Sequence, residues 1–323
     1  MRFTSIPEAY SSFRQRLLYA FDTELSSPQD VEIKIINRHD NSTIGRKLLR
    51  GVTRGEVDIA PYLRSVAVAS LPQQIEQCAI IDTHTQIAVS VEINGTTSPT
   101  LPFVAAKVEK KRSYTPLTTQ QLHRTMAHDE FDIVSLFALH DTTLEVVVEL
   151  IGSGGDTLIF TPSAGQSAIA ITARNHSNVD AIRVTIKADG VVATTINYDL
   201  KPNLRGSRRL AWLNDNMGVE CYTFPLRKSV LIEATRRHME SIWGKEAGAT
   251  ERENELKLIS AYEPQEQIEA LSAILSSPRI WLVKGNELLP TELTTERIFT
   301  APCDKMGIIE VDIRAAREGV LLW

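Results

Sequence analysis

The chain has 323 residues, of which 43% are hydrophobic and 23% are charged, with a formal net charge of -5. This composition is typical of a globular protein with enough apolar material for two or three domain cores. The acidic balance argues against a general nucleic-acid-binding protein, which would normally carry a basic face. Local basic clusters exist, such as those at 107–112 and 205–209, and because they are short we interpret them as solvated loops.

Three cysteines, Cys78, Cys221 and Cys303, lie far apart in the sequence. Their odd number and wide spacing predict neither a disulfide framework nor a C-x-x-C metal site. The N-terminus lacks the apolar core of a signal peptide, and no segment has the apolar length that a bilayer span requires. We therefore expect a protein that is synthesised in the cytoplasm and is not exported by the usual route.

The first third of the chain has the pattern of a β-rich domain. Residues 9–21, which include Tyr10 and Phe13, are aromatic and extended-looking, and they fit either an arm or a first strand. Hydrophobic residues that alternate with charged ones over 31–35 predict a half-buried strand. Further elements are expected as strands at 43–50 and 55–59, a turn at 39–41 and a short helical turn at 58–64.

A second alternating segment ends at Asn94-Gly95, which is the strongest short signal for a hairpin turn. The residues that this segment places on one face are Ile87, Val89, Val91 and Ile93. Residues 101–108 are expected to return as the partner strand. Together these elements predict that residues 1–112 form an N-terminal arm plus a β-sandwich.

Residues 113–130 are polar and form the best candidate for a linker. Alternating Val, Leu and Ile resume at 144–150 and 182–186, and Asp189-Gly190 predicts a second hairpin turn. We therefore expect residues 113–204 to hold this linker and a second β-sandwich-like domain. The second domain resembles the first in pattern and not in residue identities, so a duplication is only a suggestion.

The last third begins with two aromatic runs at 209–225 that flank an Asp-Asn-Met-Gly turn. This arrangement predicts a β-hairpin anchored by Trp212, Tyr222 and Phe224. Such residues are usually buried, so a core hairpin is the simplest interpretation. Segment 230–236 fits either strand or helix, 244–248 is expected to be a flexible tip, and 256–261 is expected to return as a strand.

One clear helix follows in this last third. Pro264 suits its first turn, and Ile268, Leu271 and Leu275 form an apolar stripe at helical spacing. Strands are expected at 280–283 and 309–313. Residues 205–323 are therefore predicted to form a smaller mixed α+β domain. The whole chain is predicted to be mainly β, with two tandem β-sandwich-like domains that precede this C-terminal domain.

No residue pattern points to catalysis or to a metal. His123 and His128 are five residues apart, which does not place two ligands on one helical face, so a solvated linker is the simpler interpretation. Gly152-Ser-Gly-Gly155 lacks the Lys-Ser/Thr of a phosphate loop and is interpreted as a hairpin loop. The acids Asp129, Glu130 and Asp132 could serve a glycosidase, but acids beside a linker are usually solvated. We predict no enzyme activity, no cofactor and no metal site.

The segment at 209–225 resembles one found in tail and baseplate-type structural proteins of Bacteroidetes phages and prophages. The likeness is carried by a basic residue followed by Leu-Ala-Trp-Leu-Asn, then a Gly-containing turn, then Tyr-Thr-Phe-Pro. Glu220 and Cys221 depart from the pattern of those proteins. Three further stretches resemble parts of those proteins. Residues 9–21 resemble their opening arm, and 58–64 resemble the end of their first β-unit. Residues 260–281 resemble their C-terminal helix and the strand that follows it.

The resemblance implies a virion tail component that docks onto copies of itself and onto other tail proteins, without nucleic acid or membrane. It implies no catalytic residue. Tyr10, Phe13, Trp212, Tyr222 and Phe224 are the expected interface or structural anchors, and the N-terminal arm and the 244–248 loop are expected to reach a neighbouring subunit. The alternative is a β-sandwich module that binds a glycan or a receptor, with Trp212 and Tyr222 stacking on sugar rings.

Overall fold

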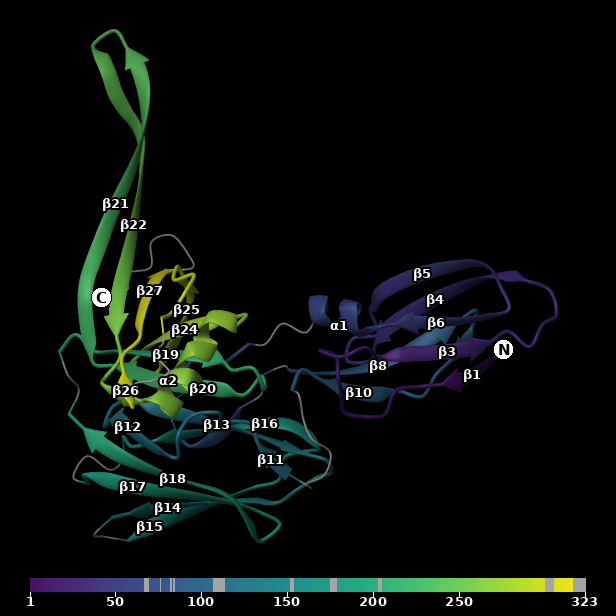
Figure 1. The fold of residues 1–323 in the computed structure, drawn as a ribbon, viewed down its shortest axis with the longest axis horizontal. Helices are drawn as coiled ribbons and strands as arrows, with labels where there is room; N and C mark the ends of the chain where they lie inside the picture. Colours follow the sequence, from purple (N-terminus) through teal and green to yellow (C-terminus); the bar gives the residue numbers. More distant parts are fainter. Residues whose placement is uncertain are drawn as a thin grey trace.

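In the computed structural model the protein is built mainly from β-strands (Figure 1). The described residues are 1–66, 70–75, 77–81, 83, 85–106, 114–151, 154–174, 179–202, 205–299 and 305–315. Within them lie only two α-helices and one 3₁₀ helix, with the longer α-helix in the C-terminal third. The prediction of a mainly β chain with one clear C-terminal helix is confirmed.

The N-terminal unit is a sandwich of two sheets around one core. The sheets have the orders β1-β3-β6 and β2-β10-β8-β4-β5, with β9 paired to β8. Their elements are β1 (Arg2–Ser5), β2 (Ser11–Ser12), β3 (Leu18–Asp22), β4 (Gln29–Asn37), β5 (Thr43–Val52), β6 (Arg54–Asp58), α1 (Ala60–Val66), β8 (Gln86–Ile93), β9 (Thr96–Thr97) and β10 (Leu101–Val104). Tyr19 and Phe21 share a buried cluster with Ile33 and Val91, so the two sheets face each other across apolar side chains.

The hairpin turn predicted at Asn94-Gly95 is confirmed. These two residues have φ of 42° and 85°, which is the backbone that a primed two-residue turn requires. Ile93 pairs with Thr96 across the turn. The returning chain forms two strands instead of one. Strand β9 pairs with the end of β8 next to the turn, and β10 pairs with the opposite end of β8. Residues 107–108 of the predicted partner lie outside the described residues.

The N-terminal segment belongs to this sandwich and is not a projecting arm. Strand β3 pairs with β1 on one side and with β6 on the other. Phe13 is 4% exposed and belongs to the core cluster. Tyr10 has φ of 58°, and its ring meets the ring of Phe137 edge-on with centroids 5.9 Å apart. The first-strand alternative is therefore the correct one, because burial of these aromatic side chains holds the segment against its own subunit.

The second unit is also a sandwich of two sheets. The sheets have the orders β11-β13-β16-β7 and β12-β18-β17-β14-β15. Their strands are β7 (Ala79–Ile81), β11 (Tyr114–Pro116), β12 (His123–Ala127), β13 (Phe131–Ala138), β14 (Leu144–Leu150), β15 (Gly155–Phe160), β16 (Gly165–Thr172), β17 (Ala181–Ala188) and β18 (Val191–Lys201). Val134 and Ile169 of the first sheet share a buried cluster with Val184 and Ile196 of the second. Asp189-Gly190 forms the predicted turn, with φ of 48° and 80°.

The linker predicted for 113–130 is instead part of the second unit over its described residues, 114–130. Strand β11 pairs with β13, and β12 pairs in parallel with β18. Leu117 and Met126 are at most 1% exposed. The polar composition was misleading because several of these polar side chains are buried with partners. Strand β7, from the range predicted for the first domain, completes a sheet of the second unit by pairing with β16.

The C-terminal unit is one sheet covered by a helix. The sheet has the order β20-β19-β24-β25-β27-β22-β21. Its elements are β19 (Arg208–Leu213), β20 (Val219–Phe224), β21 (Leu226–Ser241), β22 (Gly244–Ile259), α2 (Gln265–Ser272), β24 (Ile280–Lys284), β25 (Glu287–Leu293) and β27 (Glu310–Ala315), while β23 (Glu263–Pro264) and β26 (Met306–Gly307) pair separately. Trp212, Leu258, Leu271 and Val311 share one buried cluster. The aromatic hairpin and the mixed α+β character are confirmed.

Helix α2 begins one residue later than predicted and tightens at its end. Pro264 is the residue before its first turn, and the last turn is a 3₁₀ helix over Ala273–Ser276. A 3₁₀ turn contains three residues instead of 3.6. Ile274 therefore follows Leu271 on the buried face, and Leu275, which the helical spacing placed there, is 37% exposed.

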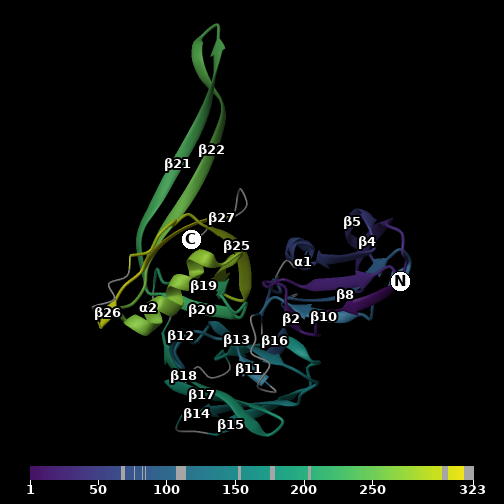
Figure 2. The ribbon, with the colours of Figure 1, turned by 45° about the vertical axis from the view of Figure 1, so that its right-hand side comes forward.

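Strands β21 and β22 form a long hairpin that projects from the C-terminal sheet (Figures 1 and 2). Each strand has 16 residues, which corresponds to roughly 50 Å. Strand β22 pairs with β27 only over 255–259, so over 244–254 its described pairing is with β21 alone. Segment 230–236 is thus strand. The predicted tip at 244–248 belongs to β22, and the apex is Ile242-Trp243.

We predict that Trp212→Ala lowers the free energy of unfolding of the C-terminal unit by about 3–5 kcal/mol, because the substitution leaves a cavity in a packed core. Trp212 is 0% exposed, whereas Trp243 is 84% exposed. Trp243→Ala is therefore the matched control, with an expected change within about 0.5 kcal/mol. Urea unfolding followed by circular dichroism measures both changes. Equal destabilisation by the two substitutions would contradict the assignment of Trp212 to the core.

Candidate functional site

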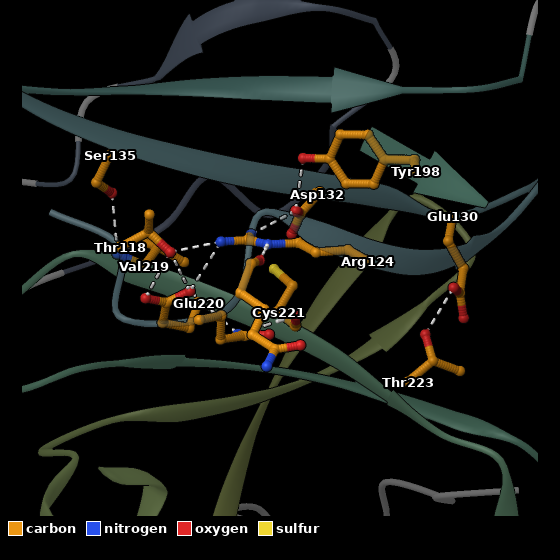
Figure 3. Close-up of polar contacts among 12 residues, drawn as sticks. Thr118, Arg124, Glu130, Asp132, Ser135, Tyr198, Val219, Glu220, Cys221 and Thr223 are labelled. Carbon is orange, nitrogen blue, oxygen red and sulfur yellow. Dashed lines mark hydrogen bonds and ion pairs between the residues drawn. The ribbon is translucent and has the colours of Figure 1, made fainter. Parts of the chain in front are cut away.

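A buried acid joins the second sandwich to the C-terminal sheet (Figure 3). Asp132 of β13 is 0% exposed. Its Oδ2 accepts hydrogen bonds from Arg124 Nη1 of β12 and from the Tyr198 hydroxyl of β18, both at 2.8 Å. Its Oδ1 accepts a hydrogen bond from Arg209 Nη2 of β19 at 3.1 Å. One carboxylate therefore contacts both the opposite sheet of its own sandwich and the first strand of the C-terminal sheet.

A second buried acid, Glu220 of β20, lies on the other side of Arg124. Its carboxylate accepts hydrogen bonds from the backbone N–H of Thr119 at 2.6 Å and from Asn214 Nδ2 at 2.7 Å. Arg124 Nη2 is 3.6 Å from its Oε2. The guanidinium of Arg124 thus lies between two carboxylates, Asp132 from the second sandwich and Glu220 from the C-terminal sheet (Figure 3).

A third acid, Glu130, which immediately precedes β13, completes this group. Its Oε2 accepts a hydrogen bond from Thr223 Oγ1 at 2.7 Å and another from the backbone N–H of Ala127 at 2.9 Å. The same oxygen is 3.5 Å from Arg209 Nη1. We call the five connected ionisable side chains the ion cluster, which consists of Arg124, Glu130, Asp132, Arg209 and Glu220.

Burial and ion pairing oppose each other in the ion cluster, and the balance differs between its acids. Burial acts to raise the pKa of Asp132, but Arg124 and Arg209 outweigh it and hold that pKa below its usual value. For Glu220 burial prevails over Arg124 and over the hydrogen bonds, so its pKa is raised. Asp132 is therefore the firm counter-ion of the two arginines, and Glu220 is the acid whose charge is more easily lost.

A pocket of about 350 Å³ opens beside the ion cluster, between β12, β20 and the start of α2. Arg124 and Arg209 contribute to its lining. Its apolar lining comes from Met126, Ala127, Tyr222, Pro225 and Ala261. Two charged side chains outside the ion cluster, Lys201 and Glu263, also line it. The volume lies at the low end of the range for small-molecule sites and would hold one large side chain.

The aromatic residues predicted as anchors are not equivalent in the structure. Trp212 and Phe224 are 0% exposed in the C-terminal core. Tyr222 is partly buried and lines the pocket, with its hydroxyl donating to Glu263 Oε1 at 2.8 Å and accepting from the N–H of Ala261 at 2.9 Å. Trp212 therefore cannot stack on a sugar ring, and of the two proposed stacking residues only Tyr222 reaches a surface.

The acids and histidines beside the predicted linker also lie differently from the expectation. Glu130 and Asp132 are buried in the ion cluster and are not solvated, and only Asp129 is exposed. His123 is on β12, where its Nε2 is 3.0 Å from Asp199 Oδ2. Arg209 is 3% exposed, which contradicts the predicted solvated basic loop at 205–209.

The sequence contained one signal for the ion cluster. Asp132 stands in the run Phe131–Ala138, whose other residues are apolar apart from Ser135, and every residue of β13 is buried. A charge inside such a run implies a buried ion that needs partners. The sequence could not name those partners, because Arg209 is 77 residues away and Tyr198 is 66 residues away.

The charged side chains of this site are paired with one another. Both arginines are paired with carboxylates. Burial raises the pKa of the Cys221 thiol, which keeps it protonated and unreactive. Among the described residues no group of His, Cys, Asp and Glu converges to hold a metal ion. None of the helices in the described ranges is long and apolar enough to cross a membrane.

The apex of the β21–β22 hairpin is a second candidate surface. Met239, Ile242 and Trp243 are 63%, 92% and 84% exposed. Gly244 follows with a φ of 107°, a conformation that glycine adopts at low cost in a reversal. Glu240 and Lys245 pair across the strands next to the apex. We call the side chains of Met239, Glu240, Ile242, Trp243 and Lys245 the hairpin tip.

In sequence, the chain matches no family model and no curated protein. In structure, part of it resembles the crystal structure of CBD12 from CALX1.2, with 9% sequence identity and a TM-score of 0.18. The likeness covers 54% of this chain and 73% of that chain. A TM-score this low carries no argument about function.

We predict that Asp132→Asn destabilises the protein by about 3–5 kcal/mol, because it leaves two buried arginines without their shared charge. Asp129→Asn is the matched control. It changes an exposed neighbour, and its expected effect is within about 0.5 kcal/mol. Urea unfolding at neutral pH measures both. A loss below about 1 kcal/mol for Asp132→Asn would show that the ion cluster does not join the units.

We further predict a pH dependence that belongs to Asp132. Its pKa is lowered in the folded protein, so its stabilisation is fully present above the ordinary aspartate pKa of about 3.9. The stabilisation is lost as the pH falls through the lower folded-state pKa. The difference in unfolding free energy between the parent chain and Asp132→Asn should therefore narrow on acidification, and a constant difference from pH 7 to pH 3 would contradict the prediction.

Proposed function

We propose that the protein is a non-enzymatic structural component of a phage or prophage-derived tail or baseplate that assembles through repeated protein–protein interfaces. The observation that carries this proposal is the β21–β22 hairpin. Its distal half extends away from the C-terminal sheet (Figures 1 and 2), and over 244–254 the described pairing of β22 is with β21 alone. This segment is roughly 35 Å long.

A two-stranded ribbon of this length is a poor independent structure. Two strands without a third strand or a packed face are only marginally stable in water. The outer edges of a ribbon also carry N–H and C=O groups that are available to another chain. A protein that retains such a ribbon gains stability when the ribbon packs on, or pairs with, a partner, and this is a common mode of β-mediated recognition.

The base of the hairpin is held firmly, which suits a projecting docking element. Leu256 and Leu258 are 0% exposed in the C-terminal core. Lys257 Nζ lies 2.8 Å from Asp312 Oδ2 of β27. The ion cluster also ties this sheet to the second sandwich, so the base of the hairpin belongs to a sheet that is bonded to its neighbouring unit.

The assignment to a tail or baseplate is supported by the resemblance of 209–225, together with 58–64 and 260–281, to such proteins of Bacteroidetes phages. On this proposal the chain is synthesised in the bacterial cytoplasm and resides in the virion tail. Its partners are other copies of itself and companion tail proteins, and it uses no cofactor, nucleic acid or membrane.

The alternative function is a β-sandwich module that binds a glycan or a receptor. The pocket beside Tyr222 favours it, because an aromatic ring together with Gln and Thr side chains is suited to a polar ligand. The burial of Trp212 removes the second stacking residue on which that alternative depended. We therefore retain assembly as the better supported function.

The test is a chain in which residues 235–251 are replaced by Asn-Gly, so that the paired residues Ala234 and Arg252 flank a two-residue turn. Since the removed segment lies beyond the C-terminal sheet, the shortened chain should keep the circular dichroism spectrum and melting temperature of the parent core. Mass photometry and negative-stain microscopy should show oligomeric rings or tubes for the full chain and monomers for the shortened chain. A full chain that stays monomeric, or a shortened chain that assembles equally well, would overturn the proposal.

A further inference from the structure

Two features of the chain remain without an occupant, the hairpin tip and the pocket between β12, β20 and α2. The tip exposes a tryptophan, the residue type most enriched among the energetic centres of protein interfaces. The pocket holds about 350 Å³. A link between these two features rests on the proposed function, because it presupposes that the hairpin is used in assembly.

The tip and the pocket are matched in polarity. Ile242 and Trp243 present apolar side chains at the apex, with exposed fractions of 92% and 84%. The pocket offers Met126, Pro225 and the ring of Tyr222 as apolar surface. An aromatic anchor in a pocket with apolar walls is the arrangement that carries most of the affinity in typical interfaces.

The tip and the pocket are also matched in charge. Glu240 and Lys245 lie opposite each other on the two strands beside the apex, and both are exposed. Outside the ion cluster the pocket lining includes a lysine and a carboxylate, Lys201 and Glu263, together with His123. Opposite charges on the two surfaces fix the orientation of docking and disfavour the reversed one.

The tip of one chain cannot occupy its own pocket. The hairpin leaves the sheet at β27 and extends in the direction opposite to β12 and the second sandwich in both views (Figures 1 and 2). Its base is fixed by the pairing of β22 with β27 over 255–259. Insertion is therefore intermolecular.

We propose that the hairpin tip of one copy inserts Trp243 into the pocket of a second copy of this chain, with Ile242 packed against the rim. In this contact Glu240 faces the neighbour's Lys201, and Lys245 faces the neighbour's Glu263. Because the tip and the pocket are different surfaces, the contact is heterologous, and its repetition generates a ring or a helical tube and not a symmetric dimer.

The experiment uses two full-length variants that each remove one half of the contact. Trp243→Ser disables the tip and leaves the pocket. Thr125→Trp fills the pocket from an exposed, pocket-lining position of β12 and leaves the tip. Ile159→Ser is the matched control, because it removes an apolar side chain of 68% exposure on β15, away from both features.

Each variant alone should be monomeric by mass photometry, while Ile159→Ser should assemble like the parent chain. An equimolar mixture of the two variants should form a 1:1 dimer and nothing larger, since it contains one intact tip and one intact pocket. A mixture that remains monomeric, or a Thr125→Trp chain that assembles normally, would overturn the inference. Unchanged circular dichroism of each variant excludes misfolding as the cause.

A charge exchange provides a second measurement. Lys201→Glu and Glu240→Lys should each weaken association roughly tenfold, and the chain with both changes should regain most of that loss. Additive weakening in the double variant would contradict the proposed pairing. If shortening the hairpin abolishes assembly while these pocket variants do not affect it, the proposed function stands and this inference fails. If shortening has no effect, both fail.

Discussion

The structure depends on one buried carboxylate, Asp132, that is shared by two arginines from different elements. A buried aspartate is tolerated only when its charge is compensated and its oxygens accept hydrogen bonds. Arg124 and Tyr198 meet this need from the opposite sheet of the same sandwich, and Arg209 meets it from the C-terminal sheet. The requirement is satisfied only when three sheets dock in one arrangement, so the ion cluster acts as a specificity device as well as a contact.

The ion cluster also affects the long β21–β22 hairpin. Strand β19, which carries Arg209, begins the C-terminal unit, and the same seven-stranded sheet ends in β22 and β21. A hairpin on a flexibly linked domain would sample many directions and lose entropy on docking. A hairpin whose base is part of a sheet tied to its neighbour presents its apex in a defined direction. The fold thus places one exposed aromatic residue, Trp243, at the apex where a partner can meet it.

The fold is predictable from the sequence where the signal is local. Alternation of Val, Ile and Leu located β4, β8, β14 and β17, and the pairs Asn94-Gly95 and Asp189-Gly190 located two turns, because backbone φ preference is a property of the residue itself. The structure of 114–130 and the burial of the acids at 130 and 132 were not predictable in this way. A polar side chain has the same appearance in a sequence whether water or a distant arginine satisfies it, so solvated and buried polar segments were confused.

The sequence by itself determined the β-rich class, most strand positions, the aromatic hairpin of 209–225 and the C-terminal helix, since these follow from periodicity and turn chemistry. Only the tertiary structure decided that Asp132 is buried, that Arg209 is its partner, that Tyr222 lines a pocket while Trp212 does not, and that the hairpin continues far beyond its sheet. The reason is physical. Burial and charge pairing are set by residues dozens of positions away, and neither leaves a mark in a local window of sequence.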